Sequence, residues 1–398
     1  MTSIHFLMDN HIQSILYEFL TGNNYYNKEN ISNIDFSTPT VLIQDYEEPD
    51  VVEDSFSSSP LLNWTQTFIW NHQNPKVCPS SKSKYIVSRG HPWGLGSQMH
   101  VIGTHLACAI EKNLILVWGS STCTRYVNSS CSSGCACLFE PLSHCSMASE
   151  NMIDNYITGG PHESPCRFLV PSRIKRKLRE LKPQMTDYQM TYWWRGQSIA
   201  YLMRFNSDLR HHIQALRQDK SLFYKTPGKN TYSSNNAFFT FPRGTINAHI
   251  RRGDKYKEMR LIDDEVYIEA FVKMISEMPL HFSSHTIFLS SDDEEAIQSS
   301  KKKLESMGYS VIYSKIPRWK NGNYIEMMDT DEYIRKHRQD FAMYHLLELQ
   351  MSMEADGWIG TRASNWNRMI DELRCIWVSK CQMPFVEVGD IHGDDYGW

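Results

Sequence analysis

The sequence lacks any long apolar segment: its 398 residues contain no uninterrupted apolar run of about 18 or more. A transmembrane helix needs about 20 such residues, so we expect none here. Residues 1–20 also lack the basic region and the continuous apolar region of a signal peptide. We therefore expect either a protein that is not secreted by the usual route or an incomplete N-terminus.

The sequence also lacks an excess of charge of either sign. Lys and Arg together number 41 and Asp and Glu 45, which gives a formal net charge of -4. Proteins that bind nucleic acid through their overall field are basic, so the composition does not indicate a nucleic-acid partner. A site for any anion would have to come from a local cluster of basic residues.

Cysteine, in contrast, is plentiful, with ten residues. Six of them lie between positions 123 and 166, and the run Cys131-x3-Cys135-x-Cys137-x7-Cys145 is the densest part. Its spacing matches no standard zinc template, and no His-x3-5-His pair accompanies it. Disulfides are the favoured interpretation, while zinc binding and free thiols stay open as alternatives.

The order of the expected elements indicates an α/β protein with two domains. Residues 1–60 are polar and predict an arm or linker, residues 61–244 an N-terminal α/β domain with the Cys-rich loop, and residues 245–398 a Rossmann-like domain. In the first domain we expect a strand at 85–87, a helix at 97–111, a strand at 114–118 and a long helix at 187–219. In the second domain we expect strands at 245–250, 286–289, 309–313 and 357–360 that alternate with helices at 263–278, 292–307, 333–354 and 364–373. Such alternation is typical of a doubly wound sheet, whose ligand lies beyond the carboxyl ends of the strands.

One basic motif, His249-Ile250-Arg251-Arg252-Gly253-Asp254-Lys255, directly follows the first expected strand of the second half. A guanidinium such as that of Arg251 can hold a phosphate through two parallel hydrogen bonds, and Lys255 can add a point charge. The alternative is a solvated basic loop in which Asp254 pairs with an arginine. The position after a strand favours an anion-binding loop.

A second pattern, Asp329-Thr330-Asp331, matches the Asp-x-Asp arrangement that holds a metal-bound diphosphate in some glycosyltransferases. It also directly precedes an expected helix, where Asp is favoured as a cap. Capping is the favoured interpretation. The pair Asp292-Asp293 precedes a helix too, so we expect capping to account for one of its two carboxylates.

The basic motif resembles the His-x-Arg-Arg-x-Asp-Lys motif of the α1,6-fucosyltransferases, which are family 23 glycosyltransferases. Further segments, spread from about Tyr85 to Leu373, resemble the same family in the expected order. They are Gly94-x-Gly96-Ser97-Gln98-x-His100, Trp193-Trp194-Arg195-Gly196-Gln197, Phe288-Leu289-Ser290-Ser291-Asp292-Asp293 and Ala355-Asp356-x4-Thr361-x2-Ser364-x3-Arg368. The resemblance implies a GT-B-like fold with a nucleotide-binding C-terminal half.

The resemblance also implies roles for individual residues. Arg251 would hold the β-phosphate of GDP-fucose, Arg252 and Lys255 would add positive charge near the leaving group, and Glu348 would read guanine. Contacts to the nucleotide sugar would come from His249, Arg251, Arg252, Asp292, Asp293, Glu348, Thr361, Ser364, Arg368, Gly96, Gln98 and His100. No metal or other cofactor is implied.

The sequence departs from the family pattern at two positions. Gly253 stands where the family has Thr, and Met259 stands where it has a proposed catalytic Glu. The candidates for the catalytic base are therefore Glu258, one residue earlier, and Asp254. Arg251 and Lys255 complete the set expected to act in catalysis.

The function implied by the resemblance is inverting, metal-independent transfer of fucose from GDP-fucose to a glycan, with the N-glycan core GlcNAc and an α1,6 linkage as the expected acceptor and product. The alternatives are a protein O-fucosyltransferase and a non-catalytic relative that binds a GDP-sugar. The family works in the secretory pathway and Golgi, and the cysteines suit such an oxidising compartment. The missing signal keeps a soluble or cytoplasmic location open.

Overall fold

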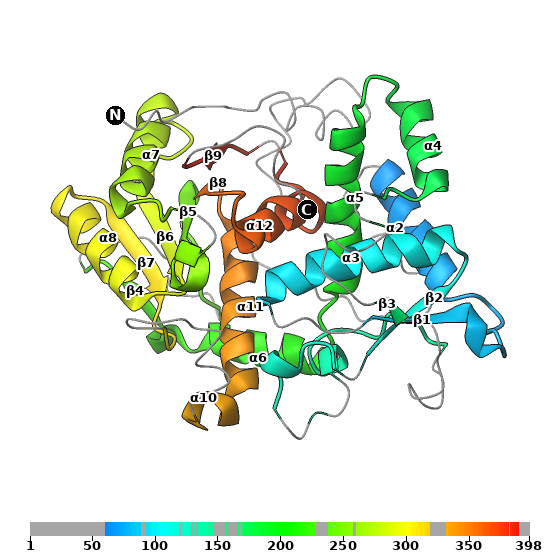
Figure 1. Cartoon of the computed structure of the whole chain (residues 1–398). Coiled ribbons are helices and arrows are strands. Elements are labelled where there is room, and N and C mark those ends of the chain that lie inside the picture. Colours follow the sequence, from blue (N-terminus) through cyan, green and yellow to red (C-terminus); the bar gives the residue numbers. More distant parts are fainter. Residues whose placement is uncertain are drawn as a thin grey trace.

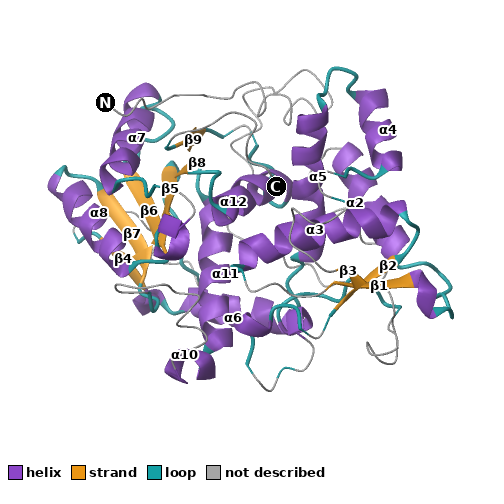
Figure 2. Cartoon of the chain, viewed as in Figure 1, coloured by secondary structure: helices purple, strands orange, loops and turns teal. Residues whose placement is uncertain are grey.

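The computed structural model describes residues 60–88, 93–119, 121–128, 131, 134–145, 156–157, 166, 169–227, 238–257, 260–318, 332–381 and 383–389. Of the polar arm expected at 1–60, residues 1–59 lie outside these ranges. Two groups of strands lie on opposite sides of the molecule, with helices between them (Figure 2). Within the described ranges, no helix is both long and apolar enough to span a bilayer.

The smaller sheet is parallel and has the strand order β2-β1-β3, with β1 at Tyr85–Ser88, β2 at Ile115–Trp118 and β3 at Tyr156–Ile157. Helix α3 (Leu95–Glu111) connects β1 to β2. This confirms the strand–turn–helix–strand unit predicted from the sequence. The helix begins two residues earlier than expected, because Leu95 and Gly96 are already part of its first buried turn.

The other helices in the described part of the first half are α2 (Pro60–Gln73), α4 (Ser172–Leu181), α5 (Asp187–Leu202) and α6 (Ser207–Gln218), with short 3-10 turns η4 (Lys82–Lys84), η5 (Thr124–Tyr126), η6 (Gly134–Cys137) and η8 (Lys220–Leu222). Helix α2 contacts β2 and α5, and α5 contacts α3, whereas α6 packs against α11 (Arg338–Glu354) of the second half. The single long helix expected at 187–219 is wrong. The chain leaves the helix after Leu202, where Phe205 forms an antiparallel bridge with Phe139, and Asn206 then caps α6 by accepting a 2.8 Å hydrogen bond from the Leu209 amide.

The larger sheet has six strands in the order β4-β7-β6-β5-β8-β9. They are β4 (Phe223–Lys225), β5 (Thr245–Ile250), β6 (Thr286–Ser291), β7 (Ser310–Ser314), β8 (Gly357–Gly360) and β9 (Phe385–Glu387). All neighbours are parallel except β4, which pairs antiparallel to β7 at the edge. The four strands predicted for the second half are confirmed, and β4 and β9 were not predicted.

Among the described residues, the helices that accompany this sheet are α7 (Asp264–Glu277), α8 (Glu294–Ser306), α10 (Glu332–Lys336), α11 (Arg338–Glu354) and α12 (Asn365–Ile376). Both faces of the sheet are buried. On β6, Ile287 joins the apolar cluster that contains Phe271 of α7, and the next residue, Phe288, joins the cluster that contains Leu346 of α11. This confirms the predicted doubly wound layering, although the helix expected at 333–354 is divided at His337 into α10 and α11.

The two halves are joined through one shared core. The cluster that holds Leu346 of α11 and Leu373 of α12 also holds Leu106 of α3 and Trp193 of α5. Figure 1 shows α12 between the larger sheet and helices α3 and α5. In addition, β4 brings residues from the region predicted as the first domain into the larger sheet. The nucleotide-binding helix expected from the sequence is therefore in direct contact with the first half.

All ten cysteines form disulfides, which confirms the favoured interpretation of the cysteine pattern. Four of the bonds lie in the first half, and one closes a short loop after α12. The pairs are Cys78–Cys145, Cys108–Cys166, Cys123–Cys135, Cys131–Cys137 and Cys375–Cys381.

Candidate functional site

The strand order places a topological switch point between β5 and β8. From β5 the chain adds β6 and β7 on one side, and it then returns to add β8 and β9 on the other side. Open α/β sheets bind ligands in the crevice that such a reversal leaves beyond the carboxyl ends of the strands. Because Ala248 pairs with Ile359, the segments after His249 and after Gly360 leave the sheet side by side. These two segments carry the arginine motif and the predicted Thr361–Arg368 contacts.

Asp292 holds the Arg251 side chain at this edge of the sheet. The Arg251 guanidinium donates to one carboxylate oxygen of Asp292 and, over 2.8 Å, to the Arg252 carbonyl. The other Asp292 oxygen accepts the Arg252 backbone N–H at 2.9 Å. Asp292 follows the end of β6, so the strand next to β5 fixes both the backbone and the side chain of the motif. An ion pair with an arginine of the motif was considered for Asp254 in the sequence analysis, whereas the structure forms it with Asp292, which was expected to contact the nucleotide sugar.

Gly253 turns the chain directly beneath this ion pair. Its φ angle is +59°, which L side chains rarely adopt. A methyl group at this position would lie 2.7 Å from an Asp292 carboxylate oxygen and 3.0 Å from Arg251 Nη1. The turn continues as the 3-10 helix η9 (Gly253–Lys257), in which Lys255 is buried and Tyr256 is exposed. The glycine that departs from the family pattern is therefore required by this loop conformation.

Arg252 points to different partners from those of Arg251. Its guanidinium forms an ion pair with Asp264 in the first turn of α7, and its Nη1 donates to the Arg251 carbonyl at 3.2 Å. Asp264 also accepts the Ser299 hydroxyl of α8. Arg252 therefore anchors the loop to α7 directly and, through Asp264 and Ser299, to α8.

His249 is a neutral hydrogen-bonding group. It is 5% exposed, and its Nδ1 lies 3.0 Å from the Ser290 hydroxyl oxygen on β6. Burial lowers the pKa of His249 to about 3, and the charge of Arg251 acts in the same direction, although Glu348 opposes the shift. The imidazole can therefore orient a ligand at neutral pH but adds no positive charge.

The two aspartates at the end of β6 have separate roles. Asp293 caps α8, because its carboxylate accepts the Ala296 amide at 2.9 Å. Asp292 forms the ion pair with Arg251. The expectation that capping accounts for one of the two carboxylates is confirmed.

The second side of the crevice is the turn that leads into α12. Thr361 accepts two hydrogen bonds from this turn, through its hydroxyl from the Ala363 amide at 3.2 Å and through its carbonyl from the Ser364 amide at 3.0 Å. Within the described structure the Ser364 side chain makes no capping hydrogen bond, although Ser364 is the N-cap residue of α12. Arg368, one turn into the helix, donates to the Asn365 side-chain oxygen at 3.1 Å and to the Arg362 carbonyl. The turn is therefore preformed at a helix N-terminus, where backbone N–H groups attract phosphate.

Glu387 at the end of β9 supports this turn from behind, and sequence reasoning missed it. Its carboxylate oxygens lie 2.8 and 3.1 Å from the Arg362 backbone nitrogen, which donates to them. Burial raises the pKa of Glu387 to about 7, against the opposing charge of Arg362. The Arg362 side chain is held in turn by Asp371, 2.9 Å from its Nε.

Glu348, expected to read guanine, lies inside an ion cluster at the carboxyl end of β7. One of its oxygens accepts from both the Arg318 guanidinium and the Ser314 hydroxyl, and the other lies 3.8 Å from His345 Nδ1. Burial raises the pKa of Glu348, but Arg318 and His345 outweigh burial, and the net pKa is lowered. Glu348 is thus an ionised carboxylate with protein partners. Sequence reasoning missed Arg318, which lies in an irregular segment with no motif around it.

The expected contacts from the first half all lie at the start of α3. Gly96 packs on α12, because a methyl group there would meet the Asn365 carbonyl carbon at 3.1 Å. The Gln98 amide joins two loops: its oxygen accepts the Cys123 amide at 3.3 Å, and its nitrogen donates to the Trp93 carbonyl at 3.0 Å. His100 lies 3.0 Å from Glu372 of α12, and burial lowers the pKa of this imidazole. These three residues connect the halves of the molecule beside the crevice.

Some predicted residues lie outside the described ranges. Glu258, Met259 and the Asp329-Thr330-Asp331 pattern are among them, and of Asp254 the structure describes only its backbone in η9. The identity of the catalytic base therefore stays a prediction.

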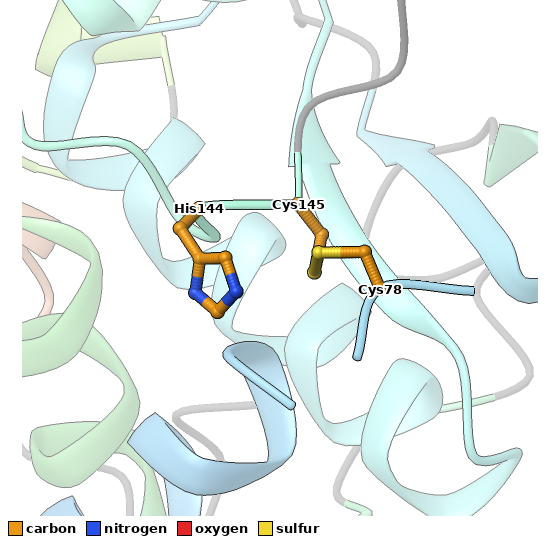
Figure 3. Close-up of side chains that lie close together, drawn as sticks. All are labelled: Cys78, His144 and Cys145. Atoms are coloured by element: carbon orange, nitrogen blue, oxygen red, sulfur yellow. A yellow bond between two sulfur atoms is a disulfide. The ribbon is translucent and has the colours of Figure 1, made fainter. Parts of the chain in front are cut away.

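Cys78, Cys145 and His144 form the one group of potential metal ligands that lies together in the described ranges (Figure 3). The two sulfur atoms are bonded to each other as a disulfide. The His144 Nδ1 lies 3.1 Å from the Asn74 side-chain oxygen. Zinc binds thiolates rather than disulfide sulfur, so the two cysteines form a covalent link and the group is not a zinc site.

No family model matches the chain, and no curated protein matches it. Among solved structures, the chain is similar to the NodZ α-1,6-fucosyltransferase soaked with GDP-fucose, with a TM-score of 0.38 and 12% identity over 73% of this chain and 93% of that chain. A second similar structure is POFUT1 in complex with GDP-fucose, with a TM-score of 0.36 and 9% identity over 79% of this chain and 100% of that chain. A third is a mutant of FUT1 from Arabidopsis thaliana in complex with GDP, with a TM-score of 0.39 and 8% identity over 79% of this chain and 77% of that chain.

Proposed function

We propose that this protein is an inverting glycosyltransferase that moves fucose from GDP-fucose to a glycan without a metal ion. The observation that carries the proposal is the arrangement at the switch point. Arg251, oriented by Asp292, leaves the sheet beside the preformed turn at the N-terminus of α12. A guanidinium and a helix N-terminus together provide positive charge and N–H donors for a diphosphate.

The charges that develop during the reaction explain why this arrangement suits it. As the bond between fucose and GDP breaks, positive charge develops on the sugar and negative charge on the departing diphosphate. Preorganised donors aimed at that negative charge lower the barrier, and they do so without the Lewis acid that other glycosyltransferases use. Lys255 would add charge on the same side. An acceptor hydroxyl attacks from the opposite face of the sugar, and a carboxylate, for which Glu258 and Asp254 are the candidates, takes its proton.

The acceptor and the compartment are further parts of the proposal. The motif resemblance supports the core GlcNAc of an N-glycan as acceptor, with an α1,6 linkage. Five disulfides support an oxidising compartment such as the Golgi lumen. A folded peptide acceptor, as in protein O-fucosylation, is the second candidate, because that reaction uses the same donor.

The test is GDP release from GDP-fucose in the presence of EDTA, with and without an N-glycan acceptor. Arg251→Ala should lower acceptor-dependent release by about 100-fold or more, since one lost charge-stabilising donor typically costs that much. Arg251→Lys keeps the positive charge but loses the two parallel N–H donors of the guanidinium. Its acceptor-dependent GDP release should therefore lie between that of the wild type and that of Arg251→Ala. Arg243→Ala is the matched control, because Arg243 is exposed and precedes the opposite end of β5.

Each other outcome has a definite meaning. Release that requires a divalent metal would refute the metal-free mechanism. Tight GDP binding without release for either a glycan or a folded peptide would identify a non-catalytic GDP-sugar binder. An absence of GDP binding would refute the proposed donor.

A further inference from the structure

One face of α12 packs closely against the first half of the molecule. Asn365, Arg368, Glu372 and Ile376 share this face through their helical spacing. At one end Gly96 of α3 touches the backbone of Asn365, and at the other a methyl group on Gly196 of α5 would meet Ile376 Cδ1 at 2.9 Å. The two glycines let α3 and α5 approach α12 closely, as Figure 1 shows for the three helices.

A buried ion cluster lies between the two glycine contacts. Glu372 is 2% exposed, and its two carboxylate oxygens face different helices. One lies 3.0 Å from His100 Nε2 on α3, and the other lies 3.1 Å from Arg195 Nη2 on α5. Removing one partner of a buried charge pair is costly, because the remaining charge stays buried without compensation. Glu372 therefore fixes the distance and rotation of α12 relative to α3 and α5.

The same face of α12 leads directly to the candidate site. The Asn365 side chain donates to the Ser97 hydroxyl at 2.8 Å, and its oxygen accepts from Arg368 at 3.1 Å. The Arg368 side chain also donates to the Arg362 carbonyl, inside the turn that precedes the helix. A rotation or shift of α12 would therefore move Arg368 and this turn together.

We propose that Glu372 is a positioning residue for the nucleotide. Through His100 and Arg195 it locks α12 against α3 and α5, and so holds Arg368 and the turn at 361–364 in the geometry that binds the diphosphate. The proposal rests on the proposed function for the identity of the ligand as GDP. The first half of the molecule then contributes to donor binding by setting the position of a helix in the second half.

The test is GDP affinity, measured by calorimetry on the whole protein, together with thermal unfolding. Glu372→Gln should weaken GDP binding by about tenfold. The matched control is Glu354→Gln, because Glu354 of α11 also pairs with a buried arginine of the first half, Arg217, at 2.9 Å. That pair joins α6 to α11 and does not involve α12. Glu354→Gln should lower the melting temperature about as much as Glu372→Gln does, but it should leave GDP affinity unchanged.

A second variant covers the case in which Glu372→Gln does not fold. Arg195→Gln removes one of the two partners and keeps the contact between His100 and Glu372, so it should weaken GDP binding by a smaller factor. Equal GDP affinity in the wild type and the folded variants would overturn the inference, and so would an equal loss in Glu354→Gln. A wild-type protein with no affinity for GDP would refute the proposed function itself, and this inference with it.

Discussion

Arg251 and Arg252 are neighbours in the sequence, yet the fold gives them different tasks. Arg251 pairs with Asp292 at the edge of the crevice, while Arg252 pairs with Asp264 of α7. The two side chains reach different elements, Asp292 after β6 and Asp264 in α7, before the chain turns at Gly253, which has a positive φ angle. The motif thus contains one arginine that pairs at the edge of the candidate site and one that anchors the loop to α7.

Glu387 predicts a pH dependence of stability. Burial raises its pKa from 4.5 to about 7, so the folded protein binds this proton more tightly than the unfolded chain. The stabilisation by this group is therefore complete below about pH 4.5 and is lost as the pH rises through about 7. We expect the free energy of unfolding to fall across this window by on the order of 1–3 kcal/mol relative to Glu387→Gln, measured by urea denaturation between pH 4.5 and 8. Parallel pH profiles for the two proteins would contradict the assignment.

The residues of the site differ in how far the sequence could predict them. His249, Arg251 and Asp292 each stand at or just after a strand that was expected from the sequence, β5 or β6, so their convergence at one edge of the sheet could be expected. Glu387 and Arg318 could not be found in this way. Glu387 ends a strand of three residues, and Arg318 follows β7 in a stretch without a pattern, so only tertiary packing brings them to the site.

At the scale of elements, the break between α5 and α6 shows how a cap overrides helical periodicity. The sequence from 187 to 219 carries apolar residues at helical spacing, and no proline or glycine divides it near the break. The structure ends α5 at Leu202 and starts α6 at Ser207, because Asn206 caps the second helix and its side-chain nitrogen donates to the Ala136 carbonyl at 3.0 Å. That carbonyl is far away in the sequence, so no local pattern reveals the break.

The cap can be tested directly. Asn206→Ala removes both side-chain hydrogen bonds and should lower the free energy of unfolding by about 1–2 kcal/mol. Asn206→Ser keeps a cap acceptor and loses the donation to Ala136 without placing a second acceptor against that carbonyl, so it should cost less. Denaturant titration of the three proteins measures the difference. Asn206→Ala with wild-type stability would show that the bridge between Phe139 and Phe205 sets the break instead.

The strands of the larger sheet were predictable to different degrees for a simple physical reason. Strands β5 to β8 are buried at every position; β6 and β7 contain short runs of consecutive apolar residues, and β5 alternates polar and apolar residues over its six positions. Strands β4 and β9 have three residues each and lie at the two edges of the sheet. Three residues are too few for a run or an alternation to stand out from the surrounding loops.

At the scale of the whole molecule, the two halves differ in what holds them together. The second half supplies five strands of the six-stranded sheet, which is covered on both faces, whereas the described residues of the first half form a sheet of three short strands and contribute the edge strand β4. Four of the five disulfides lie in the first half, including Cys108–Cys166, which ties α3 to a distant segment. The small sheet contributes few residues to the apolar core, so these four covalent links add to the stability that the packed helices of the first half supply.

This difference predicts that reduction affects the halves unequally. A native disulfide contributes about 2–4 kcal/mol, so complete reduction should cost the first half several times as much as the second, which loses one short loop at Cys375–Cys381. Hydrogen exchange after reduction should therefore accelerate first in β1 and β2, while β5 and β6 stay protected. GDP affinity should fall at the same stage, because α12 is held by α3 and α5 of the weakened half. Simultaneous loss of protection in both sheets would show instead that the shared core makes the molecule unfold as one unit.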